Sequence, residues 1–242
     1  MISTVTFSEP MADVVRRVAP VMKANGFRKR RHSFNRGAGD GIVHHLSFQM
    51  GAFDPPGTVE IPGLRPNLYG KFTVNLGVFV PAMSRMGAPR SDWINDYNCQ
   101  LRKRLGELLP EQADVWWSLE HADAGEDVRR EVSDQALPWL DRFGSYQQIV
   151  AIFETAGRDP LGMHPAAPLD LADLYIVMGD RAKARELLVH YAAAEHAPGH
   201  AGVIVDYLRA RELDDLVPLV NHRVRAGSGT GPTRSNGPVT RS

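Results

Sequence analysis

Nine histidines and one cysteine are the residues of this 242-residue chain best suited to metal binding or nucleophilic chemistry. His44 and His45 are adjacent in a segment with the two-residue alternation of a strand, so their side chains point to opposite faces and cannot share an ion. His196 and His200 have helical spacing, but a Pro-Gly pair between them interrupts a helix. The sequence therefore predicts no metal site, and we expect no cofactor.

Cys99 is the only thiol, which excludes an internal disulfide. It lies between Tyr97 and Leu101 in a segment with helical spacing, and we interpret it as a buried structural thiol. Arg102 and Arg104 follow closely and would lower its pKa, so a nucleophilic cysteine stays open as an alternative. The chain contains neither a Gly-x-Ser-x-Gly turn nor a complete phosphate-binding loop, and we assign no catalytic residue.

The most concentrated charge is the run Arg28-Lys29-Arg30-Arg31, which His32 follows. On one extended strand, Arg28, Arg30 and His32 would share a face. A basic patch of this kind suits phosphate groups, whereas the zero formal net charge argues against a general attraction to polyanions. Binding of nucleic acid or another anion through residues 28–36 is therefore an alternative function.

A second candidate surface comes from two predicted strands, 42–51 and 71–80. If they pair antiparallel, their polar side chains share one face of the sheet. The polar candidates on this face are His45, Gln49, Thr73 and Asn75. Exposed polar side chains on a rigid sheet can form a recognition surface, and the alternative is an ordinary solvated face. An enzyme with a site on this face, completed by His32, also stays open.

Hydrophobic periodicity predicts the elements that would hold these residues. The predicted helices are 9–25, 92–109 and most of 123–143, and the predicted strands are 27–36, 42–51, 71–80 and 115–119. Residues 1–143 are thus predicted to form an α+β domain, in which helices flank an antiparallel sheet of about four strands.

The pattern becomes entirely helical after residue 144 and predicts a small helical domain over 144–225. Within it, residues 171–194 resemble one helical hairpin of the tetratricopeptide type, without a tandem repeat. Residues 226–242 hold almost no large apolar side chain, so we expect a disordered tail.

Composition narrows the class of protein further. Hydrophobic residues make up 43% of the chain and charged residues 23%, which is typical of globular proteins. No apolar stretch is long enough to cross a bilayer, and the first thirty residues lack the apolar core of a signal peptide, so we expect a cytoplasmic protein. Arginine outnumbers lysine 23 to 5, which is typical of a GC-rich bacterial genome.

The zero net charge conceals a strong segregation. Residues 1–36 carry a net charge of +6, whereas residues 111–180 carry −10. The two segments either compensate each other within one fold or face partners of opposite charge. We favour compensation together with solvation, because charged side chains mostly lie on solvated faces.

Several short segments carry a resemblance to a known family. They are Gly26, Phe34-Asn35-Arg36, Gln49, Thr73-Val74-Asn75-Leu76-Gly77-Val78, Cys99-Gln100-Leu101-Arg102, Arg104-Leu105-Gly106, Trp116-Trp117 and Ala136-Leu137-Pro138-Trp139-Leu140-Asp141. Their order and spacing resemble the bacterial family catalogued as domain of unknown function 4304, over roughly residues 10–143. The resemblance implies a compact α+β domain. It implies no reaction, no cofactor and no catalytic residue.

These observations favour a bacterial protein without catalytic activity that binds another protein. The polar sheet face and the helical hairpin are the expected contact surfaces. The anion-binding strand and the enzyme site remain the two alternatives.

Overall fold

The computed structural model describes residues 7–51, 59–61, 66–84, 89, 91–163, 167–220 and 239–241. The chain divides into two compact units. The first comprises Met1–Pro81, Gly87–Gly162 and Arg234–Ser242, and the second comprises Ala82–Met86 and Met163–Thr233.

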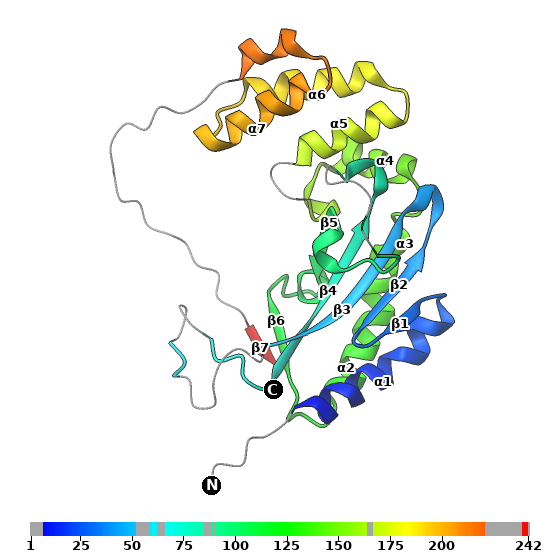
Figure 1. Cartoon of the computed structure of the whole chain (residues 1–242). Coiled ribbons are helices and arrows are strands. Elements are labelled where there is room, and N and C mark those ends of the chain that lie inside the picture. Colours follow the sequence, from blue (N-terminus) through cyan, green and yellow to red (C-terminus); the bar gives the residue numbers. More distant parts are fainter. Residues whose placement is uncertain are drawn as a thin grey trace. The chain divides into compact units, whose positions relative to one another are not determined.

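A mixed sheet forms the centre of the first unit (Figure 1). Its strands are β1 (Arg28–Arg30), β2 (Ser33–Gly37), β3 (Val43–Met50), β4 (Lys71–Phe79), β5 (Leu101–Arg104), β6 (Val115–Ser118) and β7 (Val239–Arg241). The first four strands follow one another as antiparallel neighbours, and the far edge of β4 is shared by β5 and β6. The α+β class with an antiparallel sheet is confirmed, although the sheet has more strands than the four expected.

One face of the sheet is apolar, because alternate residues of the central strands are large and hydrophobic. Phe34, Leu46 and Leu76 lie side by side across β2, β3 and β4, and all three are buried. Aromatic rings continue this layer from Phe48 to Phe72 and on to Trp117, with ring centroids 6.2 and 6.0 Å apart. The opposite face of the same strands carries the polar side chains.

Helices cover the apolar face (Figure 1). They are α1 (Ser8–Ala24), α2 (Ala124–Glu131) and α3 (Leu137–Asp141), and the chain continues into α4 (Tyr146–Ala156). A π-type turn over Val132–Ala136 joins α2 to α3. The wider turn accommodates Pro138, which lacks the N–H that a regular helix requires. The predicted helices 9–25 and 123–143 are therefore confirmed, with a local change at the proline.

Two of the predicted elements are wrong. Residues 27–36 form two strands, β1 and β2, because Arg31 takes a φ of 54° and turns the chain back on itself. Residues 92–109 do not form a helix. They form a short turn, η3 (Asp96–Asn98), then β5, then the turn η4 (Leu105–Leu108). Pairing of β5 with the edge of β4 satisfies the backbone in this segment, and it overrides the helical spacing of the leucines.

The second unit is helical. It contains α5 (Ala167–Val177), α6 (Arg181–Ala193), α7 (Pro198–Arg209) and the turn η7 (Asp214–Leu219). α5 packs against α6, as the hairpin interpretation of residues 171–194 requires. The buried Asp173 of α5 accepts hydrogen bonds from Arg211 and from the hydroxyl of Tyr207 on α7, so a buried charge is paired inside this unit.

The expected tail, residues 226–242, lies mostly outside the described residues. Within it, Val239–Arg241 forms β7, which pairs in parallel with β6. At these three residues the structure differs from the expectation of disorder, because the pairing supplies backbone hydrogen bonds that side-chain composition does not reveal.

No helix among the described residues is long and apolar enough to cross a membrane.

Candidate functional site

The predicted polar face exists, and the strand register orders it into two rows that cross the sheet. One row contains Arg30, Ser33, Ser47, Asn75 and Arg104. The other contains Arg28, Asn35, His45, Gly77 and Arg102. Gln49 lies opposite Thr73 at one end of this face. The sheet therefore places Arg28 and Arg30 of the basic run on the same side as the polar strand face.

Burial divides the polar candidates into two groups. Gln49 is exposed and Asn75 is half-buried, and the Asn75 amide donates to Gln49 Oε1 over 2.9 Å. Thr73 is fully buried, where its hydroxyl donates to the carbonyl of Val115 over 3.0 Å. Thr73 thus joins β4 to β6, and the open part of the polar face is smaller than its sequence suggests.

His45 is also buried, with 1% of its surface exposed. Its Nδ1 lies 2.8 Å from Asn35 Oδ1, while the Asn35 amide donates to the carbonyl of Ile94 over 3.1 Å. Because the Asn35 oxygen can only accept, Nδ1 of His45 carries the proton. Burial lowers the pKa of His45 to about 4, against the opposing charge of Asp96. His45 is therefore neutral at pH 7 and too weakly basic for acid–base catalysis there.

Cys99 lies in the loop that covers His45, not on a helix. Its side chain packs with Phe79 and Ile94. Gly77 of β4 leaves the room for it, because a Cβ at this position would lie 2.6 Å from Cys99 Sγ. Burial raises the pKa of the Cys99 thiol, and the nearby charge of Arg102 lowers it only as a smaller effect. The structural thiol is supported, and the nucleophilic alternative is not.

A small pocket of about 190 Å³ lies beside the exposed part of this face. Gln49 and Asn75 form part of its lining. The other lining residues are Leu76, Asp96, Arg102, Lys103, Arg104 and Glu107. Its cations are already neutralised by ion pairs, namely Arg102–Asp96, Lys103–Glu107 and Arg104–Asp114. The pocket therefore offers a ligand little unbalanced charge.

The sequence analysis missed Asp96 and Glu107 as part of this surface. The reason is the incorrect prediction of a helix over 92–109, on which these two side chains would lie far apart along the axis. The segment does not form a helix because β5 pairs with the edge of β4. No local pattern in the sequence predicts this pairing.

The enzyme alternative required His32, His45, Gln49 and Asn75 in one site. The structure brings together only Gln49 and Asn75. His45 is enclosed, and His32 lies in the β1–β2 turn, where it lines a different pocket on the side of α1. Within the described residues, no group of three or more His, Cys, Asp or Glu side chains could hold a metal ion.

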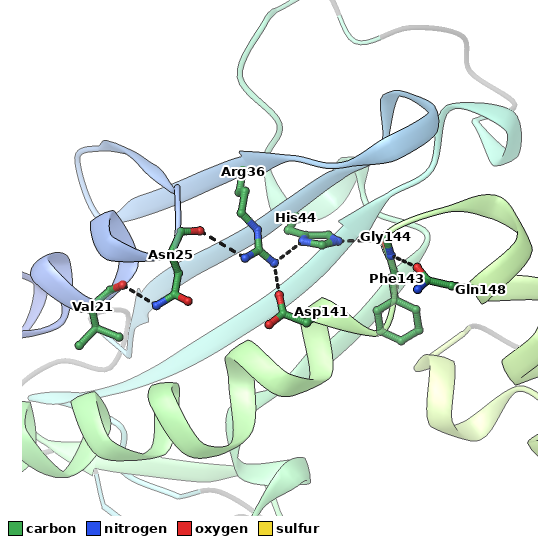
Figure 2. Close-up of polar contacts among 8 residues, drawn as sticks. All are labelled: Val21, Asn25, Arg36, His44, Asp141, Phe143, Gly144 and Gln148. Carbon is green, nitrogen blue, oxygen red and sulfur yellow. Dashed lines mark hydrogen bonds and ion pairs between the residues drawn. The ribbon is translucent and has the colours of Figure 1, made fainter.

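Arg36 belongs to the basic segment 28–36 but points away from the polar face. Its guanidinium donates to the carbonyl of Asn25, to Nδ1 of His44 over 2.8 Å, and to the carboxylate of Asp141 (Figure 2). His44 then donates through Nε2 to the carbonyl of Phe143 over 2.9 Å. His44 is therefore hydrogen bonded at both ring nitrogens and buried, with 2% of its surface exposed.

This network fastens β2 and β3 to the ends of α1 and α3, so Arg36 has a structural role. We expect Arg36→Met, which keeps the stem but removes the donors, to lower the free energy of unfolding by about 2 kcal/mol, since charged hydrogen bonds contribute ~1.5–3 kcal/mol. Urea unfolding measures this change. The matched control Arg28→Met removes an exposed arginine and should change stability by less than about 0.5 kcal/mol. Equal effects would contradict the assignment.

The remaining cations of the basic segment are exposed on the β1–β2 hairpin, which comprises Arg28–Arg30, the turn Arg31-His32 and β2. Among the described residues, none of the four cations from Arg28 to Arg31 forms an ion pair. Arg30 lies over the ring of Trp93, 6.0 Å from its centroid, and Trp93 donates to the hydroxyl of Ser33. The hairpin therefore carries concentrated, uncompensated positive charge.

The acidic part of the chain pairs with Arg36 of this hairpin, through Asp141, but with none of Arg28–Arg31 within the described residues. On α2, Glu126 pairs with Arg129 and Asp127 with Arg130. Both are local pairs within one helix. The compensation that we expected between the basic and acidic segments includes the ion pair Arg36–Asp141 but no ion pair to Arg28–Arg31 among the described residues, which leaves solvation or a partner to balance these four cations.

Comparison with known proteins adds the family but no site. No curated protein and no solved structure matches the chain. The matched family segment, residues 63–142, contains β4, β5, β6, α2 and α3 and ends before α4. It does not include the β1–β2 hairpin. Residues 63–142 match the family described as "Domain of unknown function (DUF4304)", which confirms the resemblance over this part of the chain.

Proposed function

We propose that this protein is a binding module without catalytic activity, and that its β1–β2 hairpin contacts an acidic segment of another protein. The observation that carries the proposal is the run of exposed cations at Arg28–Arg31, none of which has an ion pair among the described residues. Such a surface gains most when carboxylates approach it, because arginine donates two parallel hydrogen bonds to a carboxylate.

The state of the other candidates supports binding rather than catalysis. His45 is neutral and enclosed, Cys99 is a buried thiol with a raised pKa, and Thr73 is committed to the sheet. A bacterial cytoplasmic location is part of the proposal. The free, buried Cys99 suits a reducing compartment, and the arginine-rich composition suits a bacterial source.

A protein partner explains the small extent of the basic surface better than a nucleic acid does. The four adjacent cations Arg28–Arg31, which have no ion pair among the described residues, lie on one hairpin, and this hairpin packs against α1. α1 in turn packs against α2, which carries Glu126, Asp127 and Glu131. An extended polyanion that leaves the hairpin on this side would meet these carboxylates, whereas a short acidic peptide segment would not.

The test is fluorescence anisotropy with a labelled glutamate-rich peptide at low salt. We expect the parent protein to bind it, and the triple variant Arg28→Glu, Arg30→Glu, Arg31→Glu to bind at least roughly tenfold more weakly. The control reverses three other exposed arginines, Arg142, Arg181 and Arg209, and so makes the same change in net charge. Melting temperatures of both variants establish that the fold is intact.

Three outcomes would overturn the proposal. The first is that the parent protein fails to bind the peptide, and the second is that both variants lose affinity equally. The third is that a single-stranded oligonucleotide of matched charge binds the parent protein more than about tenfold tighter than the peptide does. The last outcome would assign the hairpin to nucleic acid. Increasing the salt concentration should weaken the peptide complex, because exposed charges are screened beyond ~10 Å at 0.1 M salt.

A further inference from the structure

An open pocket of about 460 Å³ lies between the hairpin and α1. Ala12 and Val15 of α1 form its apolar part, and Lys29, Arg31 and His32 of the hairpin form its polar part. Pockets that take small ligands range over roughly 300–1,000 Å³, so this volume is sufficient for one large side chain with the adjoining backbone.

The local structure explains why apolar and basic groups meet here. β1 alternates, so Lys29 points away from the polar face on which Arg28 and Arg30 lie, and its neighbour across the hairpin is the core residue Phe34. The turn at Arg31 then directs the next side chains toward α1. On α1 the facing residue is Ala12, whose short side chain leaves the space open.

We propose that this pocket receives one apolar side chain from the acidic segment that the hairpin binds, so that the partner motif is a leucine-like or aromatic residue flanked by carboxylates. This inference rests on the proposed function and narrows its ligand class. The carboxylates would meet Lys29 and Arg31, which have no ion pair among the described residues, while the apolar side chain would cover the half-buried Ala12 beside the buried Val15.

Charge and polarity together select this occupant. A hydrated phosphate backbone gains nothing from the apolar surface at Ala12, and an uncharged apolar segment leaves two cations unpaired. A segment with both features satisfies both sides of the pocket. His32 adds a polar group that is neutral at pH 7, because burial and then the charge of Lys29 lower its pKa.

The experiment compares two glutamate-rich peptides of equal charge, one with a central leucine and one with glycine at that position. We expect the leucine peptide to bind at least fivefold tighter. In the variant Ala12→Phe, which fills the pocket, this preference should disappear while the affinity for the glycine peptide stays unchanged. The control variant Ala24→Phe places the same side chain at the exposed end of α1 and should keep the preference.

The outcomes separate the two proposals. Equal binding of both peptides to the parent protein, or a leucine preference that persists in Ala12→Phe, would overturn this inference and leave the proposed function standing. No binding of either peptide, or much tighter binding of an oligonucleotide, would overturn the proposed function itself. The smaller substitution Ala12→Leu provides the same comparison if Ala12→Phe lowers the melting temperature.

Discussion

In the folded protein, Cys99 should react with a disulfide reagent such as 5,5′-dithiobis(2-nitrobenzoic acid) roughly 100-fold more slowly, or slower still, than in the urea-unfolded chain at the same pH. The thiolate is the reacting species, and burial raises the pKa of this thiol while it also removes access. Reaction of the native protein then requires local or global opening of the loop that covers β3 and β4.

The measurement is free of background because Cys99 is the only cysteine. Release of the coloured thiol reports this one site, and Cys99→Ala provides the blank. Rapid reaction of the native protein at pH 7 would contradict the structural assignment. It would show an accessible thiolate and would restore the alternative in which Arg102 and Arg104 activate Cys99 as a nucleophile.

The central strands could be predicted from the sequence because only one face of each is apolar. In β3, a shift of one residue would expose Leu46 and Phe48 and turn Ser47 and Gln49 into the core, so the alternation itself selects the register with β4. The helices on the apolar face were equally visible, since α1 repeats its valines at helical spacing.

The hairpin could not be predicted, because its turn lacks the usual signal. Two-residue turns in hairpins normally carry glycine or asparagine where φ is positive, whereas here that position is Arg31. The unbroken run of cations was therefore predicted to lie on one strand, residues 27–36. The resulting prediction placed His32 beside Arg28 and Arg30, whereas the turn directs it to the pocket at α1.

The burial of His45 and Thr73 could not be predicted from the sequence, for a different reason. Both lie at polar positions of a correctly predicted face, but segments distant in the sequence cover them. Asn35 and Val115 provide their hydrogen-bond partners, and the loop that holds Ile94 closes over His45. Contacts of this range follow from the tertiary structure, and the pattern along a single strand does not contain them.

Acid should begin to destabilise the protein through His45 near pH 6.5, above the range in which most carboxylates are protonated. The unfolded chain binds a proton at this residue near pH 6.5, whereas the folded chain does so only near pH 4. Between these values the unfolded state holds more protons, so the free energy of unfolding falls as the pH is lowered from 6.5 to 4. The contribution of His45 to this loss is about 3 kcal/mol, at ~1.4 kcal/mol for each pH unit of difference.

The variant His45→Gln isolates this contribution, because it removes the titrating ring and leaves the other eight histidines in place. Urea unfolding of parent and variant at pH 7 and at pH 4 should show a free energy that falls by about 3 kcal/mol more in the parent. Parallel losses in both proteins would contradict the enclosed, neutral imidazole. They would mean instead that water reaches Nε2, which has no hydrogen-bond partner among the described residues, and that the enclosed site accommodates the charge. His45 would then titrate near neutral pH, and acid–base chemistry on the polar face would again be possible.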